Sequence, residues 1–413
     1  MALDPSTRYP GQIDTTDPAG YPYGKARNRI VDGDGVGTPY ERDLVNDIFG
    51  FQQAILDAVG ATPSNTPDKV GASQYLDALR KIFASANVQQ FAFTPNAQVK
   101  ALGADILEDI FSHPNGSEFD SPLIMAVGGA TSVLRSHRGD TWIVESAVLP
   151  QNGRSIAARG TDVANVVWVV VGSLTSISTS VDGGQSWTDQ SANSAILSGS
   201  LHRVRWGNGL FVCLGNSDEI QTSPNGVAWT ARTNPSAKPL HDLHYSAAAG
   251  IWVAVGNDGA VITSIDGITW TDRTGLSVGT ADFRSVVYDE VNELWIAGGI
   301  GSVQTTADPD TENWVDRTAE FGFASTQEIA SLAVDGEGVT LATRRSGSSG
   351  DNVDGIGFSR DGGLTWVVRN YDFAQPVGGA GAALWEAIFV DGRWFIAAGD
   401  SGDDGMILVS PRR

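Results

Sequence analysis

The sequence is short of cysteine, methionine, histidine and positive charge. Its 413 residues include one cysteine, three methionines, five histidines and 27 basic residues against 48 acidic ones. The single cysteine, Cys213, excludes a disulfide framework within the chain. The formal net charge of −21 excludes the basic surface that nucleic acids require, and it opposes contact with anionic membranes.

Long apolar runs are also missing. No run reaches the 18 residues of a membrane-spanning helix, and the opening MALDPSTRYP has no basic segment followed by an apolar one. We therefore expect no membrane insertion, no nucleic-acid partner, and synthesis in the cytoplasm without a signal peptide.

Glycine, in contrast, is abundant, with 49 residues, and part of it belongs to a repeated turn. The two full copies of this turn contain Ser180, Asp182, Gly184 and Trp187, and Ser359, Asp361, Gly363 and Trp366. Partial copies end at Trp142, Trp229, Trp270 and Trp314. The six tryptophans are 45, 42, 41, 44 and 52 residues apart, a period typical of propeller blades with four strands.

Each copy is expected to fix a hairpin. Glycine supplies the positive φ angles of a tight turn, Asp accepts backbone N–H bonds, and tryptophan packs into the blade at the start of the next strand. These residues are therefore predicted to be structural, not ligand-binding.

Short apolar runs precede the turns, seven in all, and a further set of strand-like segments precedes the runs. The apolar runs are LIMAVGG, VWVVVGS, LFVCLGN (which contains Cys213 as a core residue), IWVAVGN, LWIAGGI, VTLATR and WFIAAGD. Continuous apolar runs of this length predict strands that are covered on both faces. The predicted fold is a mainly β, seven-bladed propeller of four-stranded blades; six blades is the alternative if the unit at Leu123 or Val339 is irregular.

The last unit ends at MILVSPRR, before a fourth strand, whereas residues 88–98 have no place in the first blade. We expect residues 88–98 to supply the missing outer strand, because a closed ring leaves no unpaired edge. The propeller domain is therefore expected to span residues 88–413.

Two segments precede it. Residues 1–37 carry turn-forming residues and predict an extended attachment arm that a partner orders. Residues 38–87 predict a two-helix module for oligomerisation or docking, with helices at 38–60 and 73–86. DGDGVG at Asp32 lacks the later ligands of a calcium loop. DSGDDG at Asp400 could hold calcium, but a solvated blade loop is the favoured interpretation, so no metal and no cofactor is expected.

The two full turns match the Asp-box of bacterial-neuraminidase-type repeats, and the propeller resembles Asp-box propellers. That group includes sialidases, sortilin-like receptors and photosystem II assembly factors, so the box implies a fold and says little about function. Residues 37–83, GTPYERDLVNDIFG through LRKIF, resemble the N-terminal module of bacteriophage tail-fibre proteins. GYPYGKARN at Gly20 resembles the leading arm of such proteins.

The residues of a sialidase site are not found together. That chemistry needs an arginine cluster, a tyrosine nucleophile with a glutamate, and a further acid at the propeller centre. The sequence offers arginines without a supporting motif, at Arg135, Arg138, Arg203, Arg205, Arg344 and Arg345. His241 and His244, at i and i+3 of one strand, point to opposite faces and do not form a metal site. No catalytic residue is assigned, and the protein is predicted not to be an enzyme.

The tail-fibre resemblance implies a virion protein of the phage tail, a receptor-binding fibre that forms a homotrimer. Its partners would be tail or baseplate proteins, through Tyr21, Tyr23, Lys25 and Arg27, and a host surface receptor, through the loop 344–355 with Arg344, Arg345 and Asn352. The alternatives are a propeller glycosidase or depolymerase of the tail and, second, a cellular assembly-factor propeller.

Overall fold

The computed structural model describes residues 13–14, 25–26, 94–95, 107–113, 122–129, 131–145, 148–160, 166–196, 199–216, 219–277, 279–322, 327–346, 355–370, 383–399 and 405–411. The chain divides into two compact units, Met1–Gln90 and Phe91–Arg413. In the first unit, β1 (Ile13–Asp14) pairs antiparallel with β2 (Lys25–Ala26). The helices expected at 38–60 and 73–86 lie outside the described residues.

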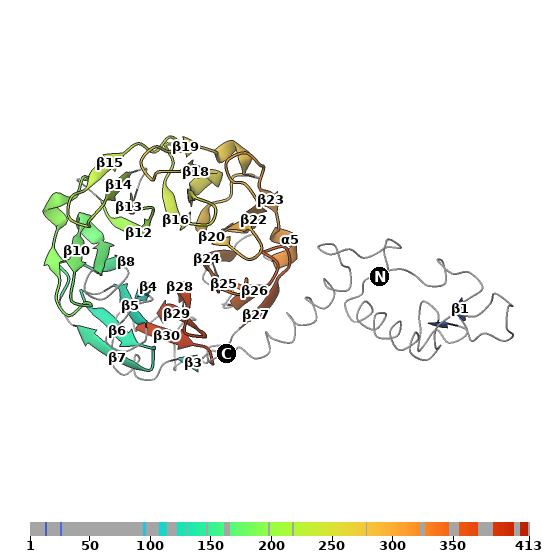
Figure 1. Ribbon diagram of the computed structural model, residues 1–413, viewed down its shortest axis with the longest axis horizontal. Helices are drawn as coiled ribbons and strands as arrows, with labels where there is room; N and C mark the ends of the chain where they lie inside the picture. The colour runs from blue at the N-terminus through green and yellow to red at the C-terminus, as the bar shows by residue number, and fades with distance from the viewer. Residues whose placement is uncertain are drawn as a thin grey trace. The chain divides into compact units, whose positions relative to one another are not determined.

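The second unit is a ring of seven four-stranded antiparallel sheets (Figure 1). This confirms the seven-bladed propeller predicted from the sequence, and the six-bladed alternative is wrong. Blades 1 to 3 contain, in order, β4 (Leu107–His113), β5 (Leu123–Gly128), β6 (Val133–His137), β7 (Thr141–Glu145); β8 (Gly153–Arg159), β9 (Val167–Gly172), β10 (Ile177–Ser180), β11 (Thr188–Asp189); β12 (Leu201–Gly207), β13 (Leu210–Gly215), β14 (Ile220–Ser223) and β15 (Thr230–Arg232).

The ring continues in the same way through the remaining blades. Blades 4 to 6 contain β16 (Leu240–Ser246), β17 (Ile251–Gly256), β18 (Val261–Ser264), β19 (Thr271–Asp272); β20 (Phe283–Asp289), β21 (Leu294–Gly299), β22 (Ser302–Thr306), β23 (Val315–Asp316); β24 (Gln327–Val334), β25 (Thr340–Ser346), β26 (Gly355–Ser359) and β27 (Val367–Asn370). Blade 7 contains β28 (Ala383–Val390), β29 (Arg393–Gly399), β30 (Gly405–Val409) and β3 (Thr94–Pro95). The helical elements of the described residues are short: η1 (Ser173–Thr175), η2 (Ser191–Asn193), η3 (Asn257–Gly259), η4 (Thr274–Leu276) and α5 (Thr318–Phe321).

Blade 7 is built from two distant parts of the chain. Thr94 of β3 pairs with Val409 of β30, and Pro95 pairs with Leu408. β3 is the outermost strand of its blade, a position in which a proline is tolerated because one edge of the strand makes no ladder hydrogen bonds. Figure 1 shows β28, β29 and β30 directly beside the first blade, where the ring closes.

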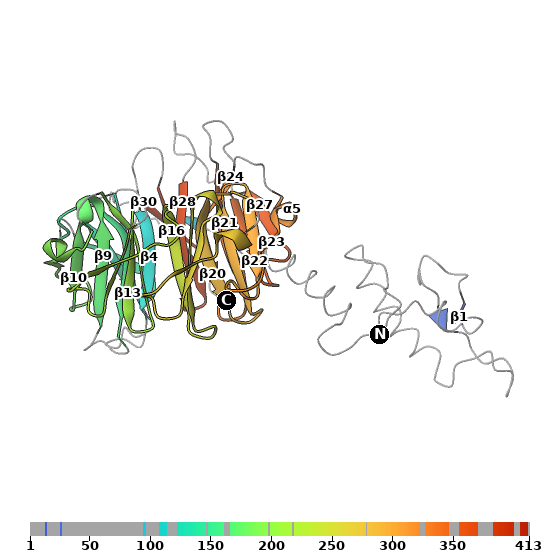
Figure 2. The same ribbon diagram turned by 90° about the horizontal axis from the view of Figure 1, so that it is seen from above.

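The core of the ring lies between neighbouring blades. The second strands, such as VWVVVG of β9 and LFVCLG of β13, are buried on both faces because each sheet packs against two others. One apolar cluster joins Leu107 and Ile124 of blade 1 to Phe395 and Ile407 of blade 7. The strands run across the thickness of the ring (Figure 2). Further apolar clusters join each pair of neighbouring blades from blade 1 to blade 6.

The full box turns are held by a shared set of hydrogen bonds. In blade 2, the backbone N–H of Gly184 donates to Ser180 Oγ at 2.9 Å, and the backbone N–H of Ser186 donates to Asp182 Oδ1 at 2.9 Å. The indole Nε1–H of Trp187 donates to the carbonyl of Gly184 at 3.1 Å. In blade 6 the corresponding bonds join Gly363 to Ser359, Thr365 to Asp361, and Trp366 to Gly363.

Two of the partial copies keep the hydrogen bond between the tryptophan and the glycine carbonyl, whereas Trp270 does not make it although its turn keeps Gly267. Trp229 Nε1–H donates to Gly226 O at 3.0 Å, and Trp142 Nε1–H donates to Gly139 O at 3.2 Å. Gly139 has a φ of 75°, and a Cβ at this position would lie 2.1 Å from Phe395 Cε1. Trp270 and Trp314 are also buried, so all four partial copies anchor a hairpin in the core.

Candidate functional site

The first strand of each blade lies at the central channel (Figure 1), and each of these seven strands carries a β-bulge. A bulge inserts an extra residue into one strand and so changes the direction of the side chains that follow. The residues that resume the pairing after the bulge are Asp109, Ser155, Arg203, Asp242, Ser285, Ser331 and Ala387.

Five of these side chains join their blade to the next one. Each accepts a hydrogen bond from a backbone N–H on the first strand of the following blade. The bonds are Ile156 N–H to Asp109 Oδ2 (2.9 Å), Val204 N–H to Ser155 Oγ (3.1 Å), Val286 N–H to Asp242 Oδ2 (3.0 Å), Leu332 N–H to Ser285 Oγ (2.9 Å) and Ala387 N–H to Ser331 Oγ (3.2 Å). We call this set the interblade belt.

Blade 3 contributes no side chain to the interblade belt, because the side chain of Arg203 has no hydrogen-bond acceptor. Arg203 instead makes ion pairs across the channel, with Nε 3.0 Å from Asp242 Oδ1 and Nη1 3.0 Å from Glu386 Oε2. Its Nη1 also lies 3.8 Å from Asp109 Oδ1. One guanidinium therefore contacts carboxylates from three other blades.

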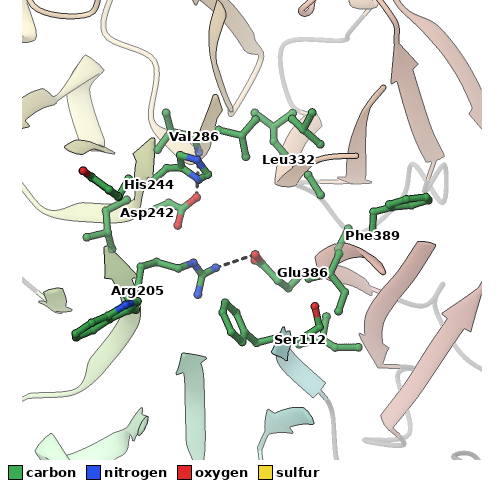
Figure 3. A pocket seen from close by; sticks show the side chains of 18 residues that line it. Ser112, Arg205, Asp242, His244, Val286, Leu332, Glu386 and Phe389 are labelled. Carbon is green, nitrogen blue, oxygen red and sulfur yellow. Dashed lines mark hydrogen bonds and ion pairs between the residues drawn. The ribbon is translucent and has the colours of Figure 1, made fainter. Parts of the chain in front are cut away.

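Arg205, two residues further along the same strand, repeats this arrangement. Its Nη1 lies 3.2 Å from Asp109 Oδ2, and its Nη2 lies 2.8 Å from Glu386 Oε1. Figure 3 shows the guanidinium of Arg205 and the carboxylate of Glu386 meeting across the channel. We call Asp109, Arg203, Arg205, Asp242 and Glu386 the ion layer.

The ion layer has an excess of negative charge, because three carboxylates face two guanidinium groups. Burial raises the pKa of Glu386 to about 7, against the lowering effect of Arg203 and Arg205. The carboxylates of Asp109 and Asp242 add repulsion in the same direction. Near neutral pH, the layer therefore holds a proton on Glu386 in part of the molecules.

The ion layer separates two mouths of the channel. One cavity of about 240 Å³ is lined by residues that precede the layer on the first strands and by Arg345 of the second strand of blade 6. The first-strand residues include Glu108, Arg154, His202, His241, Arg284, Glu328 and Trp385. Residues that follow the layer line another cavity of about 290 Å³, which includes Phe111, Trp206, His244, Tyr245 and Phe389. We call the first the arginine mouth and the second the aromatic mouth.

At the arginine mouth, the guanidinium of Arg345 stacks on Trp385, with Cζ 4.2 Å from the ring centroid, and pairs with Glu328. Arg154 and Arg284 make looser ion pairs, at 3.9 Å to Glu108 and 3.7 Å to Asp282. Burial lowers the pKa of His202 to about 4, although its ring also bonds the carbonyl of Leu240. His202 is therefore neutral at physiological pH.

At the aromatic mouth, one aromatic side chain of each of blades 3, 4 and 7 packs at a tilt against an aromatic residue on the second strand of its own blade. The pairs are Trp206 with Phe211, Tyr245 with Trp252, and Phe389 with Trp394, at centroid distances of 4.7, 5.1 and 4.9 Å. The partners are directly opposite each other in the strand register, where cross-strand pairs stabilise a sheet. The floor of this mouth is formed by Arg205, Asp242 and Glu386 (Figure 3).

Two residues that the sequence analysis placed in a surface loop are strand residues. Arg344 and Arg345 lie in β25, where they pair with Ile329 and Glu328 of β24. The loop expected at 344–355 is shorter than predicted, because β25 continues to Ser346 and β26 begins at Gly355. Asn352 lies outside the described residues.

The attachment residues are not brought to this site. Lys25 belongs to β2 of the first unit, and Tyr21, Tyr23 and Arg27 lie outside the described residues. His241 lines the arginine mouth and His244 lines the aromatic mouth. Among the residues that the structure describes, no group of three or more His, Cys, Asp and Glu is placed to hold a metal ion.

The ion layer was missed in the sequence. Its arginines stand in LHRVRWG at alternate positions of one strand, a spacing that puts two side chains on the same face. An alignment of the seven first strands would also have revealed the position, because six of the seven strands carry Asp, Ser or Arg there.

The sequence profile of the family described as photosynthesis system II assembly factor YCF48 matches residues 111–335, which are 225 of the 413 residues. The chain belongs to this family. The match begins in β4 of blade 1 and ends just after β24 of blade 6, so the YCF48 family resemblance lies entirely in the propeller.

Solved structures support the same fold. A YCF48 bound to D1 peptide is 17% identical, with a TM-score of 0.56, over 78% of this chain and 96% of that one. YCF48 from Cyanidioschyzon merolae is 18% identical, with a TM-score of 0.54, over 78% of this chain and 98% of that one. The WD40 β-propeller domain of Doa1 is 11% identical, with a TM-score of 0.53, over 75% and 94%. No curated protein matches the chain.

Membership of the YCF48 family corrects the functional reading of the sequence. The inferences of a bacteriophage tail fibre, of tail, baseplate and host-receptor partners, and of a location in the virion are wrong, because the family is one of photosynthesis system II assembly factors. Those inferences relied on residues 20–28 and 37–83, which lie outside the match, and nothing supports a tail-fibre module there. The trimer was inferred from the same resemblance and loses its basis. In the part of the chain that the structure describes, no helix is long and apolar enough to cross a membrane.

Proposed function

We propose that this protein is an assembly factor that binds a segment of a partner protein at the arginine mouth and catalyses no reaction. Membership of the YCF48 family supports the proposal, and so does the relative that is bound to a D1 peptide. This is the cellular assembly-factor alternative of the sequence analysis.

The arginine mouth offers the contacts that an extended peptide needs. Arg345 and Trp385 form a flat stacked pair, suited to the side chains or peptide planes of a ligand. Arg154 has a side chain that is 38% exposed and an ion pair of only 3.9 Å, so its guanidinium can turn to a ligand carboxylate at little cost. These cationic groups lie in a chain of net charge −21, which makes this mouth a local site for an acidic segment.

We propose that the protein is not an enzyme because the arginines of the channel already contact carboxylates of the protein. A sialidase-like site needs guanidinium groups that are free to hold a substrate carboxylate. Arg203 and Arg205 instead contact carboxylates of the protein itself, at distances from 2.8 to 3.8 Å. Incubation with sialosides and polysaccharides is expected to release no reducing ends, and turnover would contradict this part of the proposal.

The binding proposal is tested by fluorescence anisotropy with a labelled D1 peptide and the full chain. We expect saturable binding that the double variant Arg154→Gln/Arg284→Gln weakens at least tenfold, because two of the positive charges that line the mouth are lost. Arg317→Gln is the matched control: its ion pair with Glu320 is also 3.9 Å long, and it lies in an outer turn of blade 5. Binding that is absent in the native chain, or equally weakened in both variants, would reject the arginine mouth as the site.

A further inference from the structure

The aromatic mouth takes no part in the proposed function. It lies on the other side of the ion layer from the arginine mouth, because its residues follow the layer on each first strand. Its volume of about 290 Å³ is just below the range for small-molecule sites, which is about 300 to 1,000 Å³. It is therefore large enough for a group of about the size of one or two side chains.

The walls of this cavity are apolar. Phe111, Trp206, Tyr245 and Phe389 are half-buried, and aliphatic residues such as Val287 and Ile388 fill the spaces between them. The stacking partners on the second strands hold three of the aromatic rings in place. Such walls favour a ligand with a hydrocarbon stem.

The floor of the cavity is charged and favours a cation. Asp242 Oδ2 accepts hydrogen bonds from Ser285 Oγ and the backbone of Val286, whereas Asp242 Oδ1 has only the ion pair with Arg203 Nε and no bond of hydrogen-bond geometry. Asp242 is 4% exposed and lines the cavity. A buried carboxylate that is only partly compensated is costly, and an added cation lowers this cost.

The charge of the ion layer decides between ligands of opposite sign. Three carboxylates and two guanidinium groups leave one negative charge in excess, so a ligand carboxylate would increase the imbalance and a cation would remove it. A metal ion is not favoured, since the described residues contain no suitable group of ligands. A primary ammonium group is compact and carries three N–H donors, one of which fits Asp242 Oδ1, the oxygen of the cavity floor that makes no hydrogen bond.

We propose that the aromatic mouth binds a primary ammonium group on an apolar stem, with the ammonium at Asp242 and Glu386 and the stem between the aromatic walls. The same chemistry is found in a lysine side chain of a partner protein and in a free alkylamine.

The ligand competes with a proton for the ion layer. Glu386 faces Arg203 and Arg205 of β12, Asp109 of β4, and Asp242 and His244 of β16. The ammonium binds the form in which Glu386 is ionised, so binding releases a proton. We therefore expect affinity to rise about tenfold per pH unit below pH 7 and to level off above it.

The test is isothermal titration calorimetry of the full chain with n-pentylamine, n-pentanol and pentanoate at pH 8. We expect n-pentylamine to bind at least tenfold more tightly than n-pentanol, and pentanoate not to bind. Within the series from ethylamine to n-pentylamine, each methylene is expected to raise affinity about fourfold. Equal affinity for amine and alcohol, or tighter binding of pentanoate, would overturn the proposal.

A short peptide with one central lysine distinguishes the two sources. If it binds more tightly than n-pentylamine, the occupant is a protein side chain; if only n-pentylamine binds, it is a free amine. Failure of both ligands would reject the site.

Glu386→Gln tests the role of the charge, because it removes the excess carboxylate and keeps a side chain of the same size. We expect it to weaken n-pentylamine binding at least tenfold and to remove the pH dependence below pH 7, whereas Arg154→Gln/Arg284→Gln leaves both unchanged. If the Glu386 variant fails to fold, the native chain still decides: an affinity that is constant from pH 6 to pH 8 would contradict the proposal. Loss of D1-peptide binding alone would affect only the proposed function.

Discussion

Ser359 illustrates how much one buried hydroxyl group contributes to a box turn. Its Oγ accepts a hydrogen bond from the backbone N–H of Gly363 at 2.8 Å and donates one to Asp361 Oδ1 at 2.9 Å. The residue is 1% exposed, so water cannot replace these bonds when the hydroxyl is removed. The contribution of a box turn to stability therefore depends more on the burial of its hydroxyl group than on how closely the turn matches the consensus sequence.

We predict that Ser359→Ala lowers the free energy of unfolding by about 1 to 3 kcal/mol, because the N–H of Gly363 loses its buried acceptor. Urea denaturation followed by tryptophan fluorescence measures this change. Thr188→Ser, at an exposed position of β11, is the control and is expected to change stability by less than about 0.5 kcal/mol. A similar loss in both variants would show that the hydroxyl of Ser359 has no special role.

At the scale of the element, the two-residue strand β3 completes the seventh blade. Its pairing with β30 covers an edge that would otherwise present unpaired backbone groups to solvent. Removal of residues 88–98 is expected to lower the melting temperature and to broaden the transition, because blade 7 is left with three strands. Differential scanning calorimetry measures both effects.

Removal of residues 2–30, within the first unit, is the control for that deletion and is expected to leave the propeller transition in place. A sharp, unshifted transition after removal of residues 88–98 would mean that β3 does not stabilise the ring.

The elements of the ring were predictable because each repeats with the same pattern. Apolar runs such as IWVAVG identify the second strands, and the tryptophan spacing gives the blade length. The ion layer was not predictable in the same way. A bulge between Leu201 and Arg203 shifts the alternation by one residue, so the pattern alone does not reveal which side chains reach the channel.

The function was harder to predict than the fold for a related reason. The box of Asp182 and Asp361 is satisfied within its own turn, so it is compatible with many different ligands at the channel. Residues 37–83 gave a more specific signal, and it led to the wrong class of protein.

At the scale of the whole molecule, buried ionisable groups set the dependence of stability on pH. Burial lowers the pKa of His202 and of His244 to about 4, so the unfolded chain binds two more protons than the folded one between about pH 4 and pH 6.5. The stabilisation is fully present above pH 6.5 and is lost as the pH falls. Glu386, with its pKa raised to about 7 from 4.5, has the opposite effect and weakens the fold as the pH rises from about 4.5 to 7.

Since two histidines oppose one glutamate, we predict that the free energy of unfolding rises with pH from 4.5 to 6.5. The variant His202→Asn/His244→Gln is expected to reduce the slope in this range by up to about 2.7 kcal/mol per pH unit, which corresponds to two protons. Urea denaturation at half-unit pH intervals measures the slope. A slope that is the same in the variant and in the native chain would show that these rings are not neutral in the folded protein.

The closure of blade 7 also has a consequence for the order of events during biosynthesis. The ribosome releases Thr94 long before Gly405, and about 310 residues separate the two strands that must pair. At translation rates of 5 to 20 residues per second, β3 waits for roughly 15 to 60 s before its partner β30 is made. By the end of this time the residues of the first six blades have been made but blade 7 is incomplete. The flanks of blades 1 and 6 that blade 7 covers are then without their partner, so we expect the nascent chain to be most vulnerable to aggregation and to proteases just before synthesis ends.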